Sequence, residues 1–140
     1  MTETVPIKLP TQIKELALNG NCRYNLDGDS ICLNIQEIAN NRSSSTTSSD
    51  LSVELWALPQ PYEGGAFSGH ALTMCYLPPL SGQQSLRNWE YCQPIQSPPE
   101  GYWYLTLMLR EAENGVYVTR DHVNFPDRIK ADYKLTLSFA

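Results

Sequence analysis

The stretch covering residues 98–123 constrains the fold of this chain more than any other segment. A proline-glycine turn at 98–101 leads into a run of aromatic and aliphatic residues at 102–109. The run ends at Glu113-Asn114-Gly115, and an Asn-Gly pair between apolar runs is a strong β-hairpin signal. A second apolar strand then returns over residues 116–123. Two long strands joined by a tight turn predict an all-β domain built from hairpins.

Several other segments alternate apolar and polar residues, which is the period-2 pattern of half-buried strands. We expect further strands at residues 13–18, 31–36, 51–58, 71–77, 84–92 and 134–139. The 84–92 strand is rich in polar residues and fits a sheet edge. Seven to eight strands without an amphipathic helix predict an immunoglobulin-like β-sandwich of two antiparallel sheets. The expected core comprises Leu33, Ile35, Val53, Leu55, Leu72, Trp103, Leu105, Leu107, Val118 and Val123.

The chain has 140 residues, a length that fits one domain. Residues 1–12 are polar and punctuated by proline, so we expect a loose lead-in before a sandwich over 13–140. The Ser/Thr-rich stretch at 40–50 has nothing to bury and predicts a mobile loop. Residues 59–70 form a Pro/Gly-rich excursion, and long ordered loops of this kind often carry function.

The charge pattern argues against two classes of partner. The chain has 15 acidic and 10 basic residues, a net charge of −5, and the basic residues are scattered. Nucleic acids and anionic membranes attract clustered Lys and Arg, so we expect neither as a partner. No stretch reaches the roughly 18 apolar residues of a membrane-spanning helix, and the N-terminus lacks the pattern of a secretory signal. The sequence therefore predicts a cytoplasmic protein.

Four cysteines, Cys22, Cys32, Cys75 and Cys92, are the first candidates for chemistry. No pair has the Cys-x-x-Cys spacing of a zinc site or redox motif, and we expect no metal or cofactor. For a chain without an export signal, the expected state is four reduced thiols. The alternative is a bridge between Cys22 and Cys32, which lie symmetrically about Asp27 and would face each other across a hairpin.

Two other features resemble functional motifs only in part. Residues 25–29 look like the start of a calcium loop, but the twelfth position is Gln36 where the motif needs an acid. An ordinary Asp-Gly turn is the better interpretation. His70 and His122 are the only histidines, and no motif places a nucleophile beside either of them. We therefore expect no catalytic residue and no enzymatic activity.

The aromatic residues give the best indication of a binding surface. One phase of the strand at 102–109 carries Trp103 and leucines, and the opposite phase carries Tyr102, Tyr104 and Met108. A strand that is apolar on both sides needs cover from the 59–69 loop or the C-terminal segment, or else one side is an interface. The candidate binding residues are Trp56, Tyr62, Phe67, Trp89, Tyr91, Tyr102 and Tyr104.

The order of these features resembles a known group of domains. An Asn-rich turn at 38–41 is followed by Val-Glu-Leu-Trp-Ala-Leu at 53–58, Leu-Pro-Pro-Leu-Ser-Gly-Gln at 77–83, and a Pro-Gly-Tyr strand at 99–107. This pattern over roughly residues 20–125 resembles bacterial immunoglobulin-like domains of the cell-adhesion-related (CARDB) and fibronectin-III-like type. The resemblance implies a sandwich fold and a non-catalytic module that binds or spaces other proteins.

The sequence thus predicts an interaction module whose best surface is the aromatic face of the 102–108 strand with the 59–69 loop. The expected partner is another protein, or a second copy joined through edge pairing of the 134–139 strand.

Two alternative functions belong to other classes. A carbohydrate-binding sandwich would stack sugars on Trp56, Tyr62 or Trp89. A hydrolase would need His70 or His122 within hydrogen-bond reach of a serine or cysteine.

Overall fold

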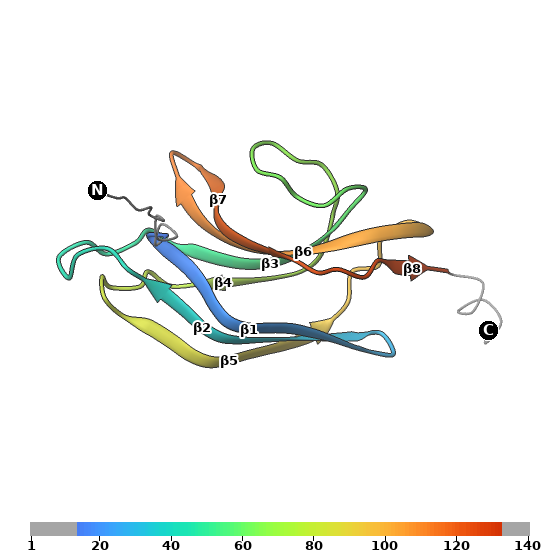
Figure 1. Ribbon diagram of the computed structural model, residues 1–140, viewed down its shortest axis with the longest axis horizontal. Coiled ribbons are helices and arrows are strands. Elements are labelled where there is room, and N and C mark those ends of the chain that lie inside the picture. Colours follow the sequence, from blue (N-terminus) through green and yellow to red (C-terminus); the bar gives the residue numbers. More distant parts are fainter. Residues whose placement is uncertain (1–13, 133–140) are drawn as a thin grey trace, which may run out of the picture.

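The computed structural model describes residues 14–132, and in this range eight β-strands form two antiparallel sheets packed as a sandwich (Figure 1). The strands are β1 (Leu16–Asp27), β2 (Ser30–Asn40), β3 (Leu51–Leu58), β4 (His70–Leu77), β5 (Ser85–Pro94), β6 (Gly101–Glu113), β7 (Val116–Asn124) and β8 (Ile129–Ala131). The smaller sheet has the order β1-β2-β5, and the larger has the order β4-β3-β6-β7 with β8 paired to β6. The prediction of an all-β sandwich is confirmed. The expected lead-in at 1–12 and strand at 134–139 lie outside the described residues.

Two tight turns produce the hairpins at the opposite ends of the chain. Gly28 and Asp29 separate the paired residues Asp27 and Ser30, and Gly28 has a φ of 64°. Asn114 and Gly115 join β6 to β7 with φ values of 53° and 85°, the left-handed pair that a two-residue hairpin loop requires. The Asn-Gly signal therefore sets the register of the β6–β7 hairpin next to the turn.

The two sheets pack through a layer of aliphatic side chains that alternate along each strand. Seven of the expected core residues are at most 1% exposed: Leu33, Ile35, Val53, Leu55, Leu72, Leu105 and Leu107. Trp103 and Val123 are only half-buried and pack against the rim of this layer. The Trp103 indole N–H donates to the Pro99 carbonyl at 2.8 Å, which keeps the ring at the end of the sandwich.

The assignment of Val118 to the core is wrong. Val118 pairs with Glu111, and it is half-buried rather than enclosed. At this end of the sandwich an ion-pair cluster, and not aliphatic side chains, fills the space around β6.

That cluster is centred on Glu111, which is 3% exposed. The Arg42 guanidinium donates to both carboxylate oxygens at 2.9 and 2.8 Å, and Arg120 Nε donates at 2.9 Å. The Ser49 backbone N–H adds a further hydrogen bond at 2.9 Å. Together these donors, with Arg42 contributing most, lower the pKa of Glu111 to about 2.

The Ser49–Glu111 hydrogen bond attaches the Ser/Thr-rich loop between β2 and β3 to the sandwich, and hydrogen bonds to Leu80 attach it further. Asn40 Nδ2 donates to the carbonyls of Thr46 and Leu80, and the Ser48 hydroxyl accepts the Leu80 N–H at 2.9 Å. Ser48 is 5% exposed, so the expectation that this stretch has nothing to bury is wrong. The polar groups of this loop form hydrogen bonds with backbone groups in place of water.

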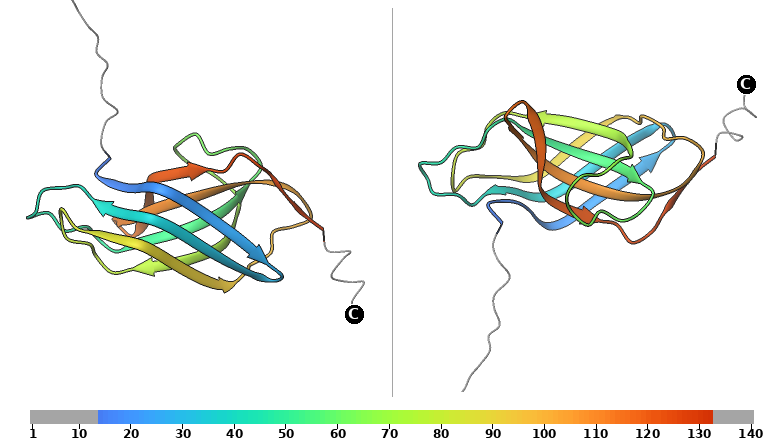
Figure 2. Two further views of the ribbon diagram at one scale, coloured as in Figure 1. Left: turned by 60° about the horizontal axis from the view of Figure 1, so that its bottom comes forward. Right: turned by 90° about the horizontal axis from the view of Figure 1, so that it is seen from above.

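Both sides of the sandwich are closed by contacts between the sheets. On one side the Leu18 N–H on β1 donates to the Asp121 carboxylate on β7 at 2.8 Å. On the other side, β5 lies next to β4 (Figure 2), and the Tyr91 hydroxyl donates to the Met74 carbonyl at 3.1 Å. β5 lies at the edge of its sheet, as the sequence predicts.

The lowered pKa of Glu111 predicts an acid-sensitive contribution to stability. Because the folded pKa of about 2 lies below the usual 4.5, this contribution is complete above pH 4.5 and disappears as the pH falls toward 2. Its size is on the order of 3 kcal/mol, since the pKa falls by about 2.5 and each pKa unit corresponds to about 1.4 kcal/mol. In urea titrations, Glu111→Gln should therefore lose stability at pH 7 and show a flatter pH dependence between 4.5 and 2. Glu113→Gln, which removes an exposed partner of Arg120, is the matched control, and equal losses in both variants would contradict the assignment.

Candidate functional site

The loop between β3 and β4, residues 59–69, covers the outer face of the larger sheet (Figure 2). Leu58, Tyr62 and Met108 form a small buried cluster there, with Trp56 and Phe67 packed against it. Met108 is fully buried and Tyr62 is 8% exposed. This cluster lies on the side of β6 that faces away from the other sheet.

The side chain of Asn124, at the end of β7, forms hydrogen bonds with the backbone of this loop at Tyr62. Its Oδ1 accepts the Tyr62 N–H at 3.1 Å, and its Nδ2 donates to the Tyr62 carbonyl at 2.9 Å. The Thr106 hydroxyl donates to the same Oδ1 at 2.6 Å, which orients the amide. The Tyr62 hydroxyl in turn donates to the Gly65 carbonyl at 3.1 Å. One amide side chain therefore fixes where the loop leaves the sheet.

The sequence left open whether a loop or an interface covers the second apolar side of β6. The structure shows that the 59–69 loop covers it at Thr106 and Met108, each 0% exposed. The aromatic face predicted for a partner is therefore largely internal at these positions. What remains accessible is the edge of the loop where it approaches β7.

A groove of about 540 Å³ lies at that edge, between the 59–69 loop and the β6–β7 hairpin. We call it the loop groove, and its principal lining residues are Trp56, Tyr62, Phe67, Arg110, Tyr117 and Thr119. The three aromatic rings contributed by β3 and the loop meet edge to face, with Phe67 centred 4.9 Å from Trp56 and 5.5 Å from Tyr62. Such edge-to-face contacts stabilise a rigid aromatic wall.

Arg110 forms the floor of the loop groove, and its guanidinium contacts four neighbouring residues. Its guanidinium contacts Glu54 at 3.2 Å, donates to the Thr119 hydroxyl at 3.0 Å and donates to the Tyr117 carbonyl at 2.9 Å. It also lies over the Phe67 ring, 5.1 Å from the centroid. Glu54 is 1% exposed and compensates the positive charge, so the floor of the groove is close to neutral.

The remaining candidate binding residues lie in two other places. Trp89 and Tyr91 stack on β5 with 5.8 Å between centroids and 13° between planes. Tyr102 is 57% exposed at the start of β6, below Arg128 at 4.8 Å, and Tyr104 lies 5.9 Å from the same guanidinium. Of the predicted set, Trp56, Tyr62 and Phe67 line the loop groove, and the other four residues form two separate pairs.

Sequence reasoning missed Arg110, Tyr117 and Thr119 as lining residues of the loop groove. The hairpin register could have indicated that these three residues lie together, because Asn114-Gly115 fixes which β7 residues oppose β6 near the turn. That register runs without interruption from the turn to the Arg110–Thr119 pair, and the break between Leu109 and Arg110 shifts only the pairs beyond it. What the sequence did not show is that the 59–69 loop lies beside these residues and closes the groove.

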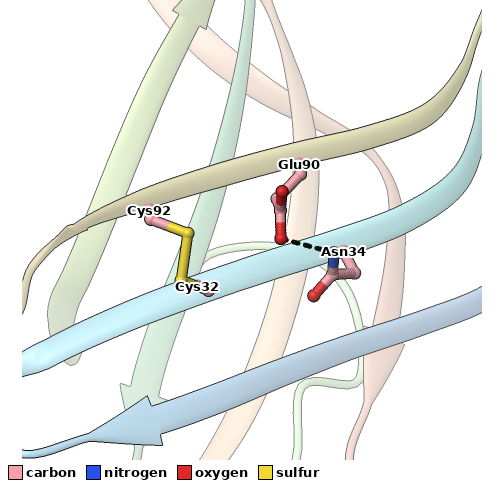
Figure 3. Close-up of a disulfide and its surroundings, with 4 residues drawn as sticks. All are labelled: Cys32, Asn34, Glu90 and Cys92. Carbon is pink, nitrogen blue, oxygen red and sulfur yellow. Dashed lines mark hydrogen bonds between the residues drawn. A yellow bond between two sulfur atoms is a disulfide. The ribbon is translucent and has the colours of Figure 1, made fainter.

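The cysteine prediction is wrong for two of the four residues. Cys32 and Cys92 are directly opposed on β2 and β5, with Cα atoms 4.0 Å apart, and they form a disulfide (Figure 3). Cys22 and Cys75 are the free thiols. The alternative Cys22–Cys32 bridge is also wrong, because the two-residue turn at Gly28-Asp29 places Cys22 opposite Ile35 and Cys32 opposite Asn25. Among residues 14–132, no three metal-binding side chains come together.

Both histidines pack against aromatic rings. His122 lies 4.8 Å from Tyr62, centroid to centroid, and burial lowers its pKa. His70 lies 5.1 Å from Trp103. In these positions the imidazoles extend the apolar packing at the loop and at the end of the sandwich.

Comparisons with protein families, curated proteins and solved structures found no match to this chain. Within residues 14–132 there is no helix able to span a membrane.

The disulfide should contribute strongly to stability, because it joins residues separated by 60 positions. Closing a loop of that size lowers the entropy of the unfolded chain by an amount worth about 4 kcal/mol at most, and 2 to 4 kcal/mol is typical. Cys32→Ser with Cys92→Ser should lower the free energy of unfolding by about that range in urea titrations. The matched control, Cys22→Ser with Cys75→Ser, should change it much less. A double variant at positions 32 and 92 with unchanged stability would contradict the bridge.

Proposed function

We propose that this domain is a non-catalytic immunoglobulin-like module that binds a protein partner through the loop groove. The observation that carries the proposal is the composition of the groove: Trp56, Tyr62, Arg110 and Tyr117 gather around one hollow. Trp, Tyr and Arg are the residue types that dominate binding energy at protein interfaces. Their rigid packing lowers the entropy cost of binding, since these side chains are already ordered.

The strand order supports the immunoglobulin-like part of the proposal. A three-stranded sheet of β1, β2 and β5 faces a sheet of order β4-β3-β6-β7, so the chain crosses between sheets after β2, β4 and β5. Such alternation between two antiparallel sheets is characteristic of immunoglobulin-like sandwiches and fits the bacterial fibronectin-III-like resemblance. A non-catalytic role fits the two histidines, which pack against rings.

A carbohydrate-binding function is the second candidate, and one observation favours it. A groove of about 200 Å³ on the smaller sheet is lined by four amide side chains, one aromatic ring, one cation and one aliphatic side chain: Asn21, Asn34, Gln36, Asn88, Trp89, Arg23 and Ile35. Amides exchange hydrogen bonds with sugar hydroxyls, and an indole face stacks on a sugar ring. Tryptophan fluorescence titrated with a glycan panel tests this, with Trp89→Ala as the variant that should lose the signal.

The state of the cysteines supports a proposal about the location of the protein. The sequence predicts a cytoplasmic protein, whereas the Cys32–Cys92 disulfide favours an oxidising compartment, because cytosolic thiols are kept reduced. We propose the oxidising compartment. Thiol alkylation of protein taken directly from its cells, followed by mass spectrometry, distinguishes the two locations. Alkylation at Cys32 and Cys92 would support the cytoplasm.

The loop groove is tested by placing a photoreactive amino acid at Thr119, inside it, and at Leu26, which is 40% exposed near the β1–β2 turn. Irradiation in a lysate of the native cells should give a discrete protein adduct from position 119 and not from position 26. Phe67→Ala should weaken the purified partner's binding at least tenfold, the effect of a lost hot spot. A partner whose affinity is unchanged by Phe67→Ala, in a variant with native circular dichroism, would refute the groove as its site.

A further inference from the structure

The aromatic surface of the loop groove continues beyond its lining residues onto β4. Tyr76 of β4 and Arg110 of β6 both pair with Ser52 of β3, so the two side chains lie on the same face of the larger sheet. The Tyr76 ring lies 5.8 Å from the Tyr117 ring of the hairpin, centroid to centroid, with 47° between the planes. Tyr76 is 65% exposed and Tyr117 is half-buried, so both rings are accessible from solvent.

The opposite side of the groove is also aromatic. Phe67 in the loop and Trp56 on β3 meet edge to face there, as described above. Aromatic rings therefore border the hollow on both the loop side and the hairpin side. We call this surface the aromatic track, and it consists of Trp56, Phe67, Tyr117 and Tyr76.

The floor of the groove favours a neutral segment over a charged one. Among the described residues that line the groove, Arg110 is the only one with a charge. Its guanidinium contacts the buried Glu54 carboxylate at 3.2 Å, and the two charges compensate each other. An acidic or a basic segment would therefore gain little attraction from this floor.

The sheet offers such a segment side chains, and not a free backbone edge. β3 lies between β4 and β6, and β6 lies between β3 and β7, so the backbone of both strands below the groove is already paired. β7 has its free edge on the side away from β6, outside the groove. Binding by strand addition requires an unpaired edge. A segment in the groove must therefore be recognised through its side chains and through its own carbonyl groups.

Hydrogen-bond donors for such carbonyl groups are available beside the aromatic rings. An arginine has five N–H groups, and three of those of Arg110 have the partners described above. Within residues 14–132, the other two N–H groups of Arg110 and the hydroxyls of Tyr117 and Tyr76 have no hydrogen-bond partner. The groove thus combines aromatic faces with unused donors.

We propose that the loop groove binds a proline-rich segment of the protein partner in the polyproline II conformation. The inference rests on the proposed function and adds the chemistry of the bound segment. Docking of proline-rich segments in aromatic-lined grooves is a recurrent mode of peptide recognition. A polyproline II helix has no internal hydrogen bonds, so its carbonyls are free to accept from Arg110 and Tyr117. In an α-helix the backbone carbonyls are already occupied within the helix.

The entropy of binding favours the same kind of segment. A proline-rich segment is already extended before it binds, so little conformational freedom is lost. The groove is equally ordered, because edge-to-face contacts fix the loop wall and the Tyr117 carbonyl accepts a hydrogen bond from Arg110 at 2.9 Å. Two pre-ordered surfaces can bind through a small contact area.

The test begins with a phage-displayed library of short random peptides selected on the purified domain. Phage that also bind the Tyr117→Ser variant are removed at each round. We expect the remaining peptides to be rich in proline, with prolines recurring in the Pro-x-x-Pro pattern of polyproline II ligands. Enrichment of peptides without proline, or no enrichment over the variant, would overturn the inference.

The strongest selected peptide is then titrated by fluorescence anisotropy. Replacing its prolines by alanine should weaken binding at least tenfold, and so should Tyr117→Ser in the domain. Tyr117→Phe removes only the hydroxyl and should weaken binding by about two- to tenfold, the effect of one hydrogen bond. Tyr102→Ser is the matched control, because Tyr102 is 57% exposed outside the groove, and the affinity should not change. Added salt should also leave the affinity nearly unchanged, since the floor is neutral.

Two results of this titration would overturn the inference. One is an affinity that is unaffected when the prolines are replaced. The other is an affinity that is equal for the wild type and for a Tyr117→Ser variant with native circular dichroism.

The native partner separates this inference from the proposed function. A partner that cross-links at position 119 and depends on Phe67, yet binds through a segment without proline, would overturn the polyproline inference alone. A partner that is insensitive to Phe67→Ala would refute the groove itself, and both proposals would fail.

Discussion

β6 is apolar on both faces, and the rest of the structure depends on covering both of them. Leu105, Leu107 and Leu109 point into the layer between the sheets, where they are fully buried. Burial of such side chains contributes about 1.5 to 3 kcal/mol each and is the main force that joins the two sheets. Within residues 14–132 there is no third sheet to cover the opposite face, at Thr106 and Met108. The 59–69 loop supplies that cover, which explains why a loop so long is ordered.

Covering this face also creates the candidate site. The Asn124 side chain binds the Tyr62 backbone, and the Tyr62 ring packs on Met108. The rest of the loop is separated from β7 by a hollow. The loop groove is the space left between them, with Arg110 held at its floor by Glu54. A structural requirement of one strand thus determines where aromatic side chains become available to a partner.

Local sequence signals predicted most of the fold. The Asn-Gly turn and the alternating strands depend on neighbouring residues, so they could be recognised without the tertiary structure. The Cys32–Cys92 bridge and the Arg42–Glu111 pair join residues 60 and 69 positions apart, and both depend on strand register. One sequence does not show which distant strands pair or in what register, so neither contact could be recognised from it. Arg110 and Thr119 pair in the register that the Asn-Gly turn sets, but only the tertiary position of the 59–69 loop makes them groove residues.

A double-mutant cycle between Tyr62 and Met108 tests most directly whether the loop and the outer face of β6 form one packed unit. Stability would be measured by urea titration for Tyr62→Ala, Met108→Ala and the double variant. We predict a coupling energy of about 0.5 to 3 kcal/mol, as for residues in contact, and additive effects for Tyr62→Ala with Leu33→Ala in the other sheet. Additivity within about 0.3 kcal/mol for Tyr62 and Met108 would contradict the account, because the loop would then not cover β6.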